Sequence, residues 1–478
     1  MTKKTIIIIA LLLACVCIFA CCAKESFKFD ALKVDAMEGE LTSNGGVSVS
    51  YKGYTYFING DVGKFDIDNT FGKVKYGAIC RIKTEYILDD SFVDLDIGSA
   101  EYNTKTENKV EILAPKAYFN NNTATNSLNG LFIFSDRLYY TTPSTTTDKN
   151  GAVQNTFLDI MSVKLDGTDT KRLYTVNSNT YEMMLSQVGD KVYASYVNEN
   201  KLYCINLFDA KPQAEEIVDN VSAYKFDVNS GKIALTLNII VKKENQATEI
   251  TLKYNTINLF TPGDEKVTLV LSGERKSEQD VSYDVSAILQ RIQDNYIYFA
   301  VTNDAHGRDG IYRIGTDQRD VMFSTVTPET NATFKKMSTQ NLLENGILYK
   351  EGQNEYIIFY NSSEKYIQLF NIANGNVSNL LYTTSAPTFV GINNGKLFYT
   401  AINLYYVTLT EGEQDSGIML STITNAVSWA GFDIYDDYVL YMAATENSDV
   451  YLSSAKIIDK GEDIQQIFIG IYSEQEEE

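Results

Sequence analysis

Short runs of alternating apolar and polar residues recur along most of the chain and predict β-strands. The segment VGDKVYASYVNENKLYCINL, residues 188–207, places two runs of alternating tyrosine and aliphatic residues on either side of the polar turn VNEN. A period of two residues, interrupted by a polar turn, is typical of a β-hairpin with one buried face. We therefore predict a hairpin over these residues.

Similar segments recur at a regular distance and predict a repeat architecture. They begin at residues 51, 128, 228, 292, 342, 392 and 434. Their spacing is mostly about 40 to 60 residues, the range expected for four-stranded propeller blades. Sustained helical periodicity is absent after the N-terminal segment, which disfavours a helical solenoid. We predict an all-β chain that forms a β-propeller of about seven to eight four-stranded antiparallel blades.

The blade count depends on how the first unit is interpreted. Eight units begin near Gly45, Ala114, Asn177, Val221, Val281, Thr330, Thr384 and Ala426. The first is overlong, and its excess around Asp89–Leu113 is either an insertion or an additional strand pair, which leaves seven blades as an alternative. The strand-like QQIFIGIY from residue 465 could complete a blade with GGVSVSY from residue 45. That arrangement would share one blade between the two ends of the chain.

The N-terminal segment has the composition of a signal peptide. Lys3 and Lys4 precede an apolar run over Ile6–Ala20, which is shorter than the roughly 20 residues that a membrane span needs. The sequence IFAC, ending at Cys21, resembles the lipobox of bacterial lipoproteins, in which the cysteine is lipidated and becomes the mature N-terminus. LLAC, ending at Cys15, is closer to the lipobox pattern but leaves an apolar run of only about nine residues.

We therefore predict lipidation at Cys21, with Cys15 as the alternative and Cys22 as a third choice. The predicted organisation is a lipoprotein signal peptide over residues 1–20, a lipid anchor and spacer over 21–44, a single propeller domain over 45–472 and an acidic tail over 473–478. The two remaining cysteines, Cys80 and Cys204, lie in strand-like segments. We expect them to be buried as small apolar residues rather than joined in a disulfide.

The charge balance excludes one class of partner. The 478-residue chain has a formal net charge of −21, with 62 acidic against 41 basic residues. A surface of this sign repels a nucleic-acid backbone and an anionic lipid surface. We therefore predict no nucleic-acid partner, and contact with the membrane only through the lipid anchor.

The repeated units resemble a known group of bacterial propellers. The segment IMSVKLDGTDTKRLYTV, residues 160–176, and the tyrosine hairpins are similar to repeats in lipoproteins and surface proteins of Firmicutes, described as low-density-lipoprotein-receptor-like β-propellers. The resemblance covers most of residues 45–472. It implies the propeller fold and a Gram-positive source, but hardly any function, because that group has no agreed activity and propellers host many functions.

Few residues stand out as candidates for catalysis. The single histidine, His306, lies in the predicted hairpin loop TNDAHGRDG, and no G-x-S-x-G motif occurs. A serine or cysteine hydrolase would have to use that histidine. The single tryptophan, Trp429, is expected to pack within or between blades. Carboxylates in the central funnel could serve a glycosidase, but the sequence marks no pair among the 62 acidic residues.

Two loops offer oxygen ligands for a structural calcium ion. Asn303, Asp304 and Asp309 share one loop, and Asp66 and Asp68 share another. Neither loop has the spacing of an EF-hand, and such clusters are ordinary in β-turns. We therefore predict no metal or cofactor, with structural calcium as the less favoured reading.

The favoured functional prediction is a surface-exposed, lipid-anchored propeller that binds or scaffolds without catalysis. Its partner would be a protein or a glycan at the outer face of the cytoplasmic membrane, held by loops on a rigid ring. The alternative is a carbohydrate-active enzyme with carboxylates in the propeller funnel.

Overall fold

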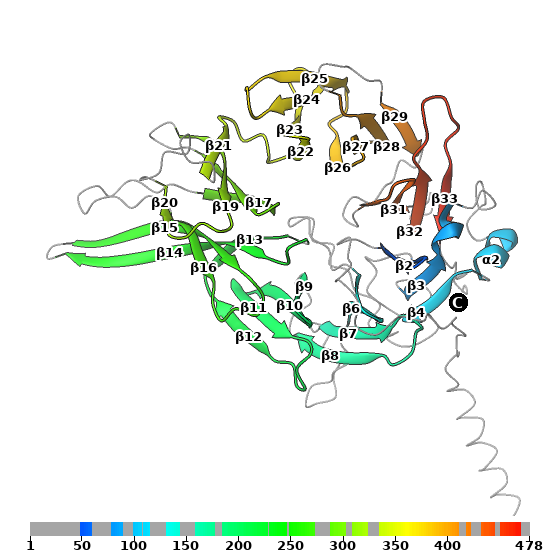
Figure 1. Cartoon of the computed structure of the whole chain (residues 1–478), viewed down its shortest axis with the longest axis horizontal. Helices are drawn as coiled ribbons and strands as arrows, with labels where there is room; N and C mark the ends of the chain where they lie inside the picture. Colours follow the sequence, from blue (N-terminus) through cyan, green and yellow to red (C-terminus); the bar gives the residue numbers. More distant parts are fainter. Residues whose placement is uncertain are drawn as a thin grey trace, which may run out of the picture.

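Eight antiparallel sheets, seven of four strands and one with an added fifth strand in parallel, form a ring of propeller blades in the computed structural model (Figure 1). The structure describes residues 48–59, 78–88, 99–107, 109–114, 131–143, 158–176, 184–227, 229–245, 248–272, 287–302, 308–323, 334–410, 417–421, 432–444 and 450–469. The prediction of an all-β propeller is confirmed, and the blade number is eight.

Blades 1 to 4 follow one another along the first half of the chain. Blade 1 contains β1 (Ser48–Tyr51), β2 (Tyr54–Asn59), β3 (Ala78–Lys83) and β4 (Glu111–Ala114). Blade 2 contains β5 (Phe132–Phe134), β6 (Arg137–Pro143), β7 (Leu158–Lys164) and β8 (Lys171–Val176). Blade 3 contains β9 (Met184–Val188), β10 (Lys191–Asn198), β11 (Lys201–Asn206) and β12 (Ala214–Val218). Blade 4 contains β13 (Val221–Phe226), β14 (Ile233–Asn245), β15 (Thr248–Phe260) and β16 (Thr268–Ser272).

Blades 5 to 8 complete the ring. Blade 5 contains β17 (Ala287–Gln293), β18 (Tyr296–Val301), β19 (Gly310–Gly315) and β21 (Phe334–Ser338), while β20 (Val321–Met322) joins the sheet of blade 4. Blade 6 contains β22 (Ile347–Glu351), β23 (Asn354–Asn361), β24 (Tyr366–Asn371) and β25 (Val377–Tyr382). Blade 7 contains β26 (Thr388–Asn393), β27 (Lys396–Ala401), β28 (Asn403–Thr408) and β29 (Ile418–Ser421). Blade 8 contains β30 (Phe432–Ile434), β31 (Tyr438–Ala444), β32 (Val450–Lys456) and β33 (Gln466–Ile469).

The first strand of each blade lies nearest the centre of the ring. First strands of neighbouring blades contact one another, as β13 does β17 and β26 does β30. Each sheet buries both faces against its neighbours. One apolar cluster, for example, joins Ile358 and Leu369 of blade 6 to Leu397 and Val407 of blade 7. Burial of both faces explains why these strands are rich in aliphatic and tyrosine residues on either side.

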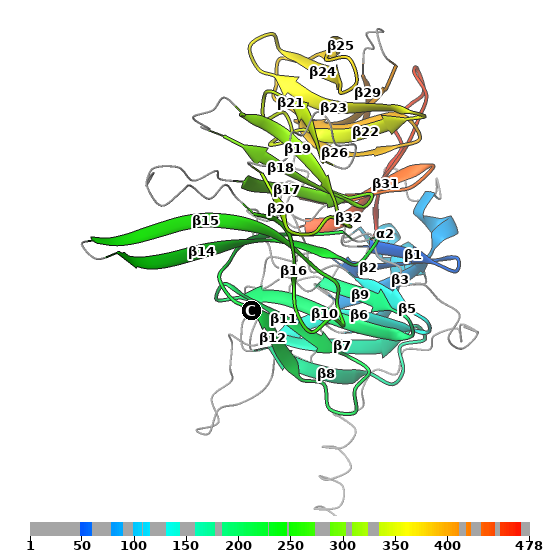
Figure 2. The same ribbon diagram turned by 60° about the vertical axis from the view of Figure 1, so that its left-hand side comes forward.

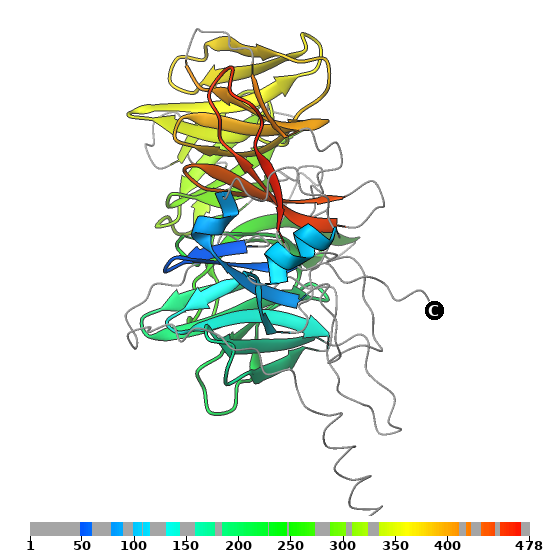
Figure 3. The same ribbon diagram turned by 90° about the vertical axis from the view of Figure 1, so that its right-hand side faces the viewer.

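The excess length of blade 1 contains helical turns, and no further strand pair occurs in the part of this insertion that the structure describes. The 3₁₀ helix η1 (Thr84–Leu88) and the helix α2 (Ala100–Glu107) lie between β3 and β4. Figure 3 shows both beside the C-terminal blade, where η1 contacts β32 and β33. Two predicted unit starts were misplaced: Ala114 ends β4, and Thr330 precedes the fourth strand of blade 5 rather than the first strand of blade 6.

The prediction of a blade shared between the chain ends is wrong. β1 pairs with β2 inside blade 1, and β33 pairs with β32 inside blade 8. Side chains close the ring instead: Asp433 on β30 accepts hydrogen bonds from the backbone N–H of Ser48 at 3.0 Å and from the Ser48 hydroxyl. Ser454 Oγ also donates to the carbonyl of Ile87 at 2.9 Å. An apolar cluster shared by blades 1, 2 and 8 surrounds these contacts.

Tight turns use the residues that the sequence predicted. Asp294 and Asn295 join β17 to β18 with φ angles of 52° and 63°, and Asn394 and Gly395 join β26 to β27 with 48° and 71°. Two consecutive positive φ angles match the twist of a two-residue hairpin, and Asn, Asp and Gly tolerate them best. The predicted hairpin of residues 188–207 is β10 and β11, paired in register from Tyr193 opposite Asn206 to Asn198 opposite Lys201.

The hairpin of β14 and β15 departs from the regular blade. Each strand has 13 residues, and the pair remains in register from Ile233 opposite Phe260 to Asn245 opposite Thr248. Figure 2 shows the distal half of this hairpin extending beyond the other blades. Among the helices that the structure describes, none is long and apolar enough to cross a membrane.

Candidate functional site

A cleft between blades 4 and 5 is the candidate binding site. Its volume is about 650 Å³, within the range of roughly 300–1,000 Å³ that is usual for ligand pockets. It is lined by Lys232, Leu259, Thr261, Asp294, Asn295, Tyr296, Gly315, Thr316, Asp317 and Arg319. The first three belong to blade 4 and the others to blade 5. The cleft therefore exists only because two blades meet.

The wall from blade 5 is a pair of turns held together by backbone hydrogen bonds. Thr316 N–H, just after β19, donates to the carbonyl of Asn295 in the turn between β17 and β18 at 2.9 Å. Gly315 leaves room for the side chain of Asp317, because a Cβ at position 315 would lie 2.5 Å from Asp317 Oδ1. Arg319 Nη1 donates to the carbonyls of Thr316 and Gln318 at 2.8 and 2.7 Å. These bonds fix the polar groups that face the cleft.

The same backbone bond recurs around the ring and stiffens this side of the molecule. In each case the donor is the backbone N–H of the residue that follows the third strand of a blade. The acceptor is a backbone carbonyl at the start of the second strand, or in the turn that precedes the second strand. The bonds run from Leu165 to Asp136, Leu207 to Val192, Ile372 to Glu355, Leu409 to Gly395 and Ile457 to Asp437, with lengths of 2.8–3.0 Å. Ligand-binding groups on the side of the ring that carries these turns need little ordering on binding.

An exchanged strand joins the two walls of the cleft. β20 leaves blade 5 and pairs in parallel with β16 of blade 4, where Leu271 lies opposite Val321. Phe323, directly after β20, is buried and packs back into blade 5 against Tyr312 and Phe299, with ring centroids 5.2 and 6.3 Å apart. This strand limits how far the two blades can separate.

Charges of both signs face the cleft. Lys232 enters from blade 4, and blade 5 contributes Arg319 with Asp294 and Asp317. Both carboxylates accept hydrogen bonds from neighbouring glutamines at 3.2–3.3 Å. The cleft thus offers charged donors and charged acceptors close together. Such a set can hold a polar ligand that hydrogen-bonds in both directions.

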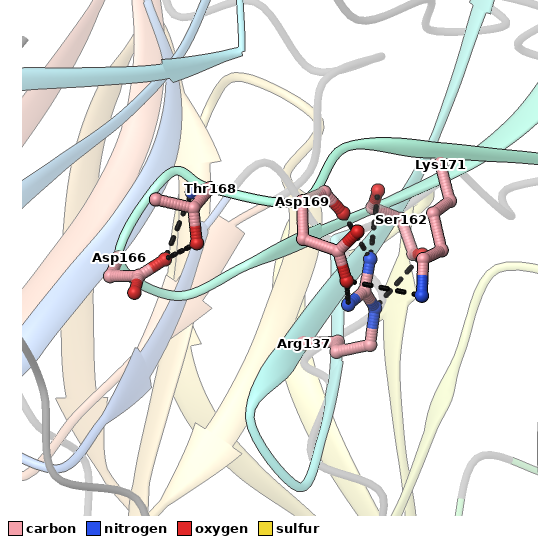
Figure 4. Close-up of polar contacts among 6 residues, drawn as sticks. All are labelled: Arg137, Ser162, Asp166, Thr168, Asp169 and Lys171. Carbon is pink, nitrogen blue, oxygen red and sulfur yellow. Dashed lines mark hydrogen bonds and ion pairs between the residues drawn. The ribbon is translucent and has the colours of Figure 1, made fainter.

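The DGTD turn of blade 2, which carries the clearest repeat motif, is structural. Asp166 accepts hydrogen bonds from Thr168 N–H at 2.9 Å and Thr168 Oγ1 at 2.5 Å (Figure 4). Asp169 Oδ2 accepts from Arg137 Nη1 at 2.9 Å and lies 3.1 Å from Lys171 Nζ. The bonds from Lys171 and Arg137 lower the pKa of Asp169. Both carboxylates are engaged within the turn, so the motif stabilises the hairpin.

The first strands, which line the centre of the ring, carry few carboxylates. Among the described residues of these eight strands, only Glu351 and Asp433 are acidic. Asp433 is 2% exposed and binds Ser48, whereas Glu351 ends β22 at the surface. A glycosidase needs two carboxylates about 5–9.5 Å apart across the substrate. The described part of the centre presents no such pair with both groups open to a ligand.

Most of the residues singled out in the sequence lie outside the described part of the chain. These are Cys15, Cys21, Cys22, Asp66, Asp68, Asn303, Asp304, His306 and Trp429. Asp309 is described and exposed. Within the described ranges, no three His, Cys, Asp or Glu side chains gather as a metal site would require. The lipidation and calcium predictions thus stay predictions.

Cys80 and Cys204 are buried and not joined in a disulfide, as predicted. They belong to β3 and β11, in different blades. Burial raises the pKa of both thiols, which keeps them protonated and unreactive. Neither cysteine lines the cleft.

Comparisons with known proteins find solved structures that match this chain with low sequence identity and low TM-scores. No protein-family profile matches the chain, and no curated protein does. The β-propeller domain of the Trilobed protease from Pyrococcus furiosus, described as having an open velcro topology, is 16% identical, with a TM-score of 0.36 over 70% of this chain and 92% of that one. YCF48 bound to D1 peptide is 9% identical, with a TM-score of 0.34 over 69% of this chain and 98% of that one.

A puromycin-hydrolyzing peptidase of Mycobacterium tuberculosis is also similar. It is 9% identical, with a TM-score of 0.39 over 67% of this chain, and the match spans 50% of the peptidase. All three TM-scores are below 0.5, so the propeller assignment rests on the strand pairing of this chain itself. The comparisons assign no activity. The sequence reasoning did not single out Lys232, Asp317 or Arg319, because no motif marks them.

Proposed function

We propose that this protein is a lipid-anchored, surface-exposed β-propeller that binds or scaffolds a partner without catalysis. The observation that carries the proposal is the cleft between blades 4 and 5, where two rigid walls present charged donors and acceptors. Its partner would be a segment of a protein or a glycan at the cell surface. The resemblance of its repeats to propellers in Firmicutes lipoproteins supports this placement at the outer face of the cytoplasmic membrane.

The charged groups of the cleft suit the binding of a polar ligand. Lys232 and Arg319 can donate to carbonyl, hydroxyl or carboxylate oxygens, and Asp294 and Asp317 can accept from amide or hydroxyl groups. Amides and sugar hydroxyls provide both kinds of partner. A ring whose walls are pre-formed loses little conformational entropy on binding.

The anchor prediction is tested by metabolic labelling with palmitate. In cells that produce the full chain, Cys21→Ala should abolish labelling, because that thiol is the proposed acceptor. Cys15→Ala should leave the label in place. Labelling that is lost with Cys15→Ala and retained with Cys21→Ala would contradict the choice of Cys21.

The binding prediction is tested by replacing Lys232. Titration calorimetry with muropeptides, β-glucan oligosaccharides and short peptides identifies a bound compound. For that compound, Lys232→Ala should weaken affinity about tenfold or more, because hydrogen bonds to charged groups contribute about 1.5–3 kcal/mol and 1.4 kcal/mol is tenfold. The matched control is Lys201→Ala, whose ammonium pairs with Glu216 at 2.8 Å on blade 3. Equal losses in both variants would show that the cleft is not the site.

A further inference from the structure

The face of blade 5 that packs against blade 6 carries a row of charged side chains. Arg291 on β17 lies opposite Tyr298, Tyr298 opposite Arg313, and Arg313 opposite Lys335. Residues that pair directly across adjacent strands share one face of a sheet. Arg313 Nη1 lies 2.6 Å from Glu355 Oε1 on β23. The shared face is therefore the one turned toward blade 6.

Positive charge exceeds negative charge in this interface. On blade 6, Lys350 lies opposite Glu355, so both face blade 5. The described groups on this face are four cations, Arg291, Arg313, Lys335 and the exposed Lys350, against Glu355 and the nearby Asp294, which also lines the cleft with blade 4. The excess is notable in a chain whose formal net charge is −21.

Arg291 has no anionic partner among the described residues. Among the residues that the structure describes, no carboxylate lies within ion-pair distance of its guanidinium. Burial lowers the pKa of Arg291, and only the nearby Tyr298 opposes this shift. Arg291 is half-buried, and the partial removal of a cation from water without a paired anion is unfavourable. The position is therefore costly unless something else neutralises it.

Arg313 presents a second unused donor to the same interface. Its Nη1 binds Glu355, and its guanidinium lies 4.6 Å from the centre of the Tyr296 ring. Its Nε is buried and has no hydrogen-bond partner within the described part of the chain. Buried donors are nearly always satisfied in native proteins, so an orphan indicates a missing acceptor.

We propose that Arg291 and Arg313 bind an oxyanion, a carboxylate or phosphate group, between blades 5 and 6. Guanidinium groups suit such ligands because their planar N–H donors match the geometry of two oxygens. The two arginines lie on the face of blade 5 opposite Ile297 and Phe299, which pack against blade 4, and Tyr296 is the residue that this site shares with the cleft. A bound anion would join two blades and compensate the surplus charge.

The proposal is tested with inorganic phosphate and acetate as probes. The full chain, purified in neutral detergent, is titrated by calorimetry at constant ionic strength set with sodium chloride. We expect saturable binding of at least one probe. Arg291→Gln should weaken it about tenfold or more, and Arg291→Lys should weaken it about fivefold, because a lysine keeps the charge but loses the planar donors. Lys201→Gln, on blade 3, should bind as the unaltered chain does.

The two probes distinguish the sources of the anion. Tighter binding of phosphate assigns a phosphate or phosphodiester ligand, and tighter binding of acetate assigns a carboxylate from a protein partner; either result supports the site. The proposal is overturned if neither probe binds more tightly than chloride does, or if Arg291→Gln leaves the affinity for the probe unchanged. If circular dichroism shows that Arg291→Gln does not fold, unchanged affinity in Arg291→Lys overturns the proposal instead. Lys232→Ala tests the blade 4 cleft separately, so the two proposals can fail independently.

Discussion

Glu111→Ala is expected to lower the free energy of unfolding by about 1.5–3 kcal/mol. Arg81 on β3 is fully buried, and its Nε donates to Glu111 Oε2 at 2.5 Å. Its Nη1 donates to the carbonyl of Leu165 in blade 2 at 2.9 Å, and the guanidinium lies 4.6 Å from the Tyr54 ring centre. Replacing Glu111 would remove a short charged hydrogen bond from a fully buried guanidinium, and hydrogen bonds to charged groups contribute about 1.5–3 kcal/mol.

Urea denaturation followed by circular dichroism measures the effect of Glu111→Ala. The matched control is Glu85→Ala, because Glu85 is exposed and lies 3.9 Å from Lys83 on the same blade. Exposed pairs of this kind contribute about 0–1 kcal/mol. If Glu111→Ala and Glu85→Ala lower the free energy of unfolding by the same small amount, the ion pair between Arg81 and Glu111 does not stabilise the blade.

Asp433→Ala is expected to lower the free energy of unfolding by about 2–3 kcal/mol, through loss of ring closure. The Asp433 carboxylate joins β30 of blade 8 to Ser48 on β1 of blade 1, the first described strand of the chain. No strand is shared between the two blades, so this bond and the surrounding apolar contacts hold the ends of the ring together. Without the carboxylate, Ser48 loses the two hydrogen bonds that it donates to blade 8.

The control for Asp433→Ala lies in the same blade. Asp437 is exposed in the turn between β30 and β31, where its backbone carbonyl accepts from Ile457 N–H. Asp437→Ala should change unfolding in urea by less than about 0.5 kcal/mol. A double-mutant cycle with Ser48→Ala should give a coupling energy of at least about 1 kcal/mol. A coupling near zero would refute closure of the ring through this contact.

The sequence predicted the positions of the strands better than it predicted which strands pair. The hairpin of β10 and β11 follows from local alternation and a polar turn, both visible in a single window of residues. The pairing partner of β33 does not follow from local alternation, because the apolar segment around Ile467 and Ile469 suits blade 8 and a blade shared with the N-terminus equally well. The register of β33 on β32 depends on three-dimensional packing, which a local pattern does not contain.

The candidate sites were harder to predict than the fold. Asp294 was visible as a turn residue, but Lys232 and Arg319 meet it only because two blades pack side by side. Arg291 and Arg313 likewise sit in ordinary strand sequences, and their common face follows only from the observed register. Acidic residues were so numerous that the sequence could not separate Asp433, which closes the ring, from those in exposed turns.

We propose that the ring binds a partner without transforming it. The most direct measurement incubates the full chain with the muropeptide and glycan panel, quantifies binding by calorimetry, and follows each compound by mass spectrometry. We predict saturable binding that weakens in Lys232→Ala, with every compound recovered unchanged. Cleavage of any compound that is lost on replacing Glu351 or another single carboxylate near the centre would contradict the account and establish a carbohydrate-active enzyme.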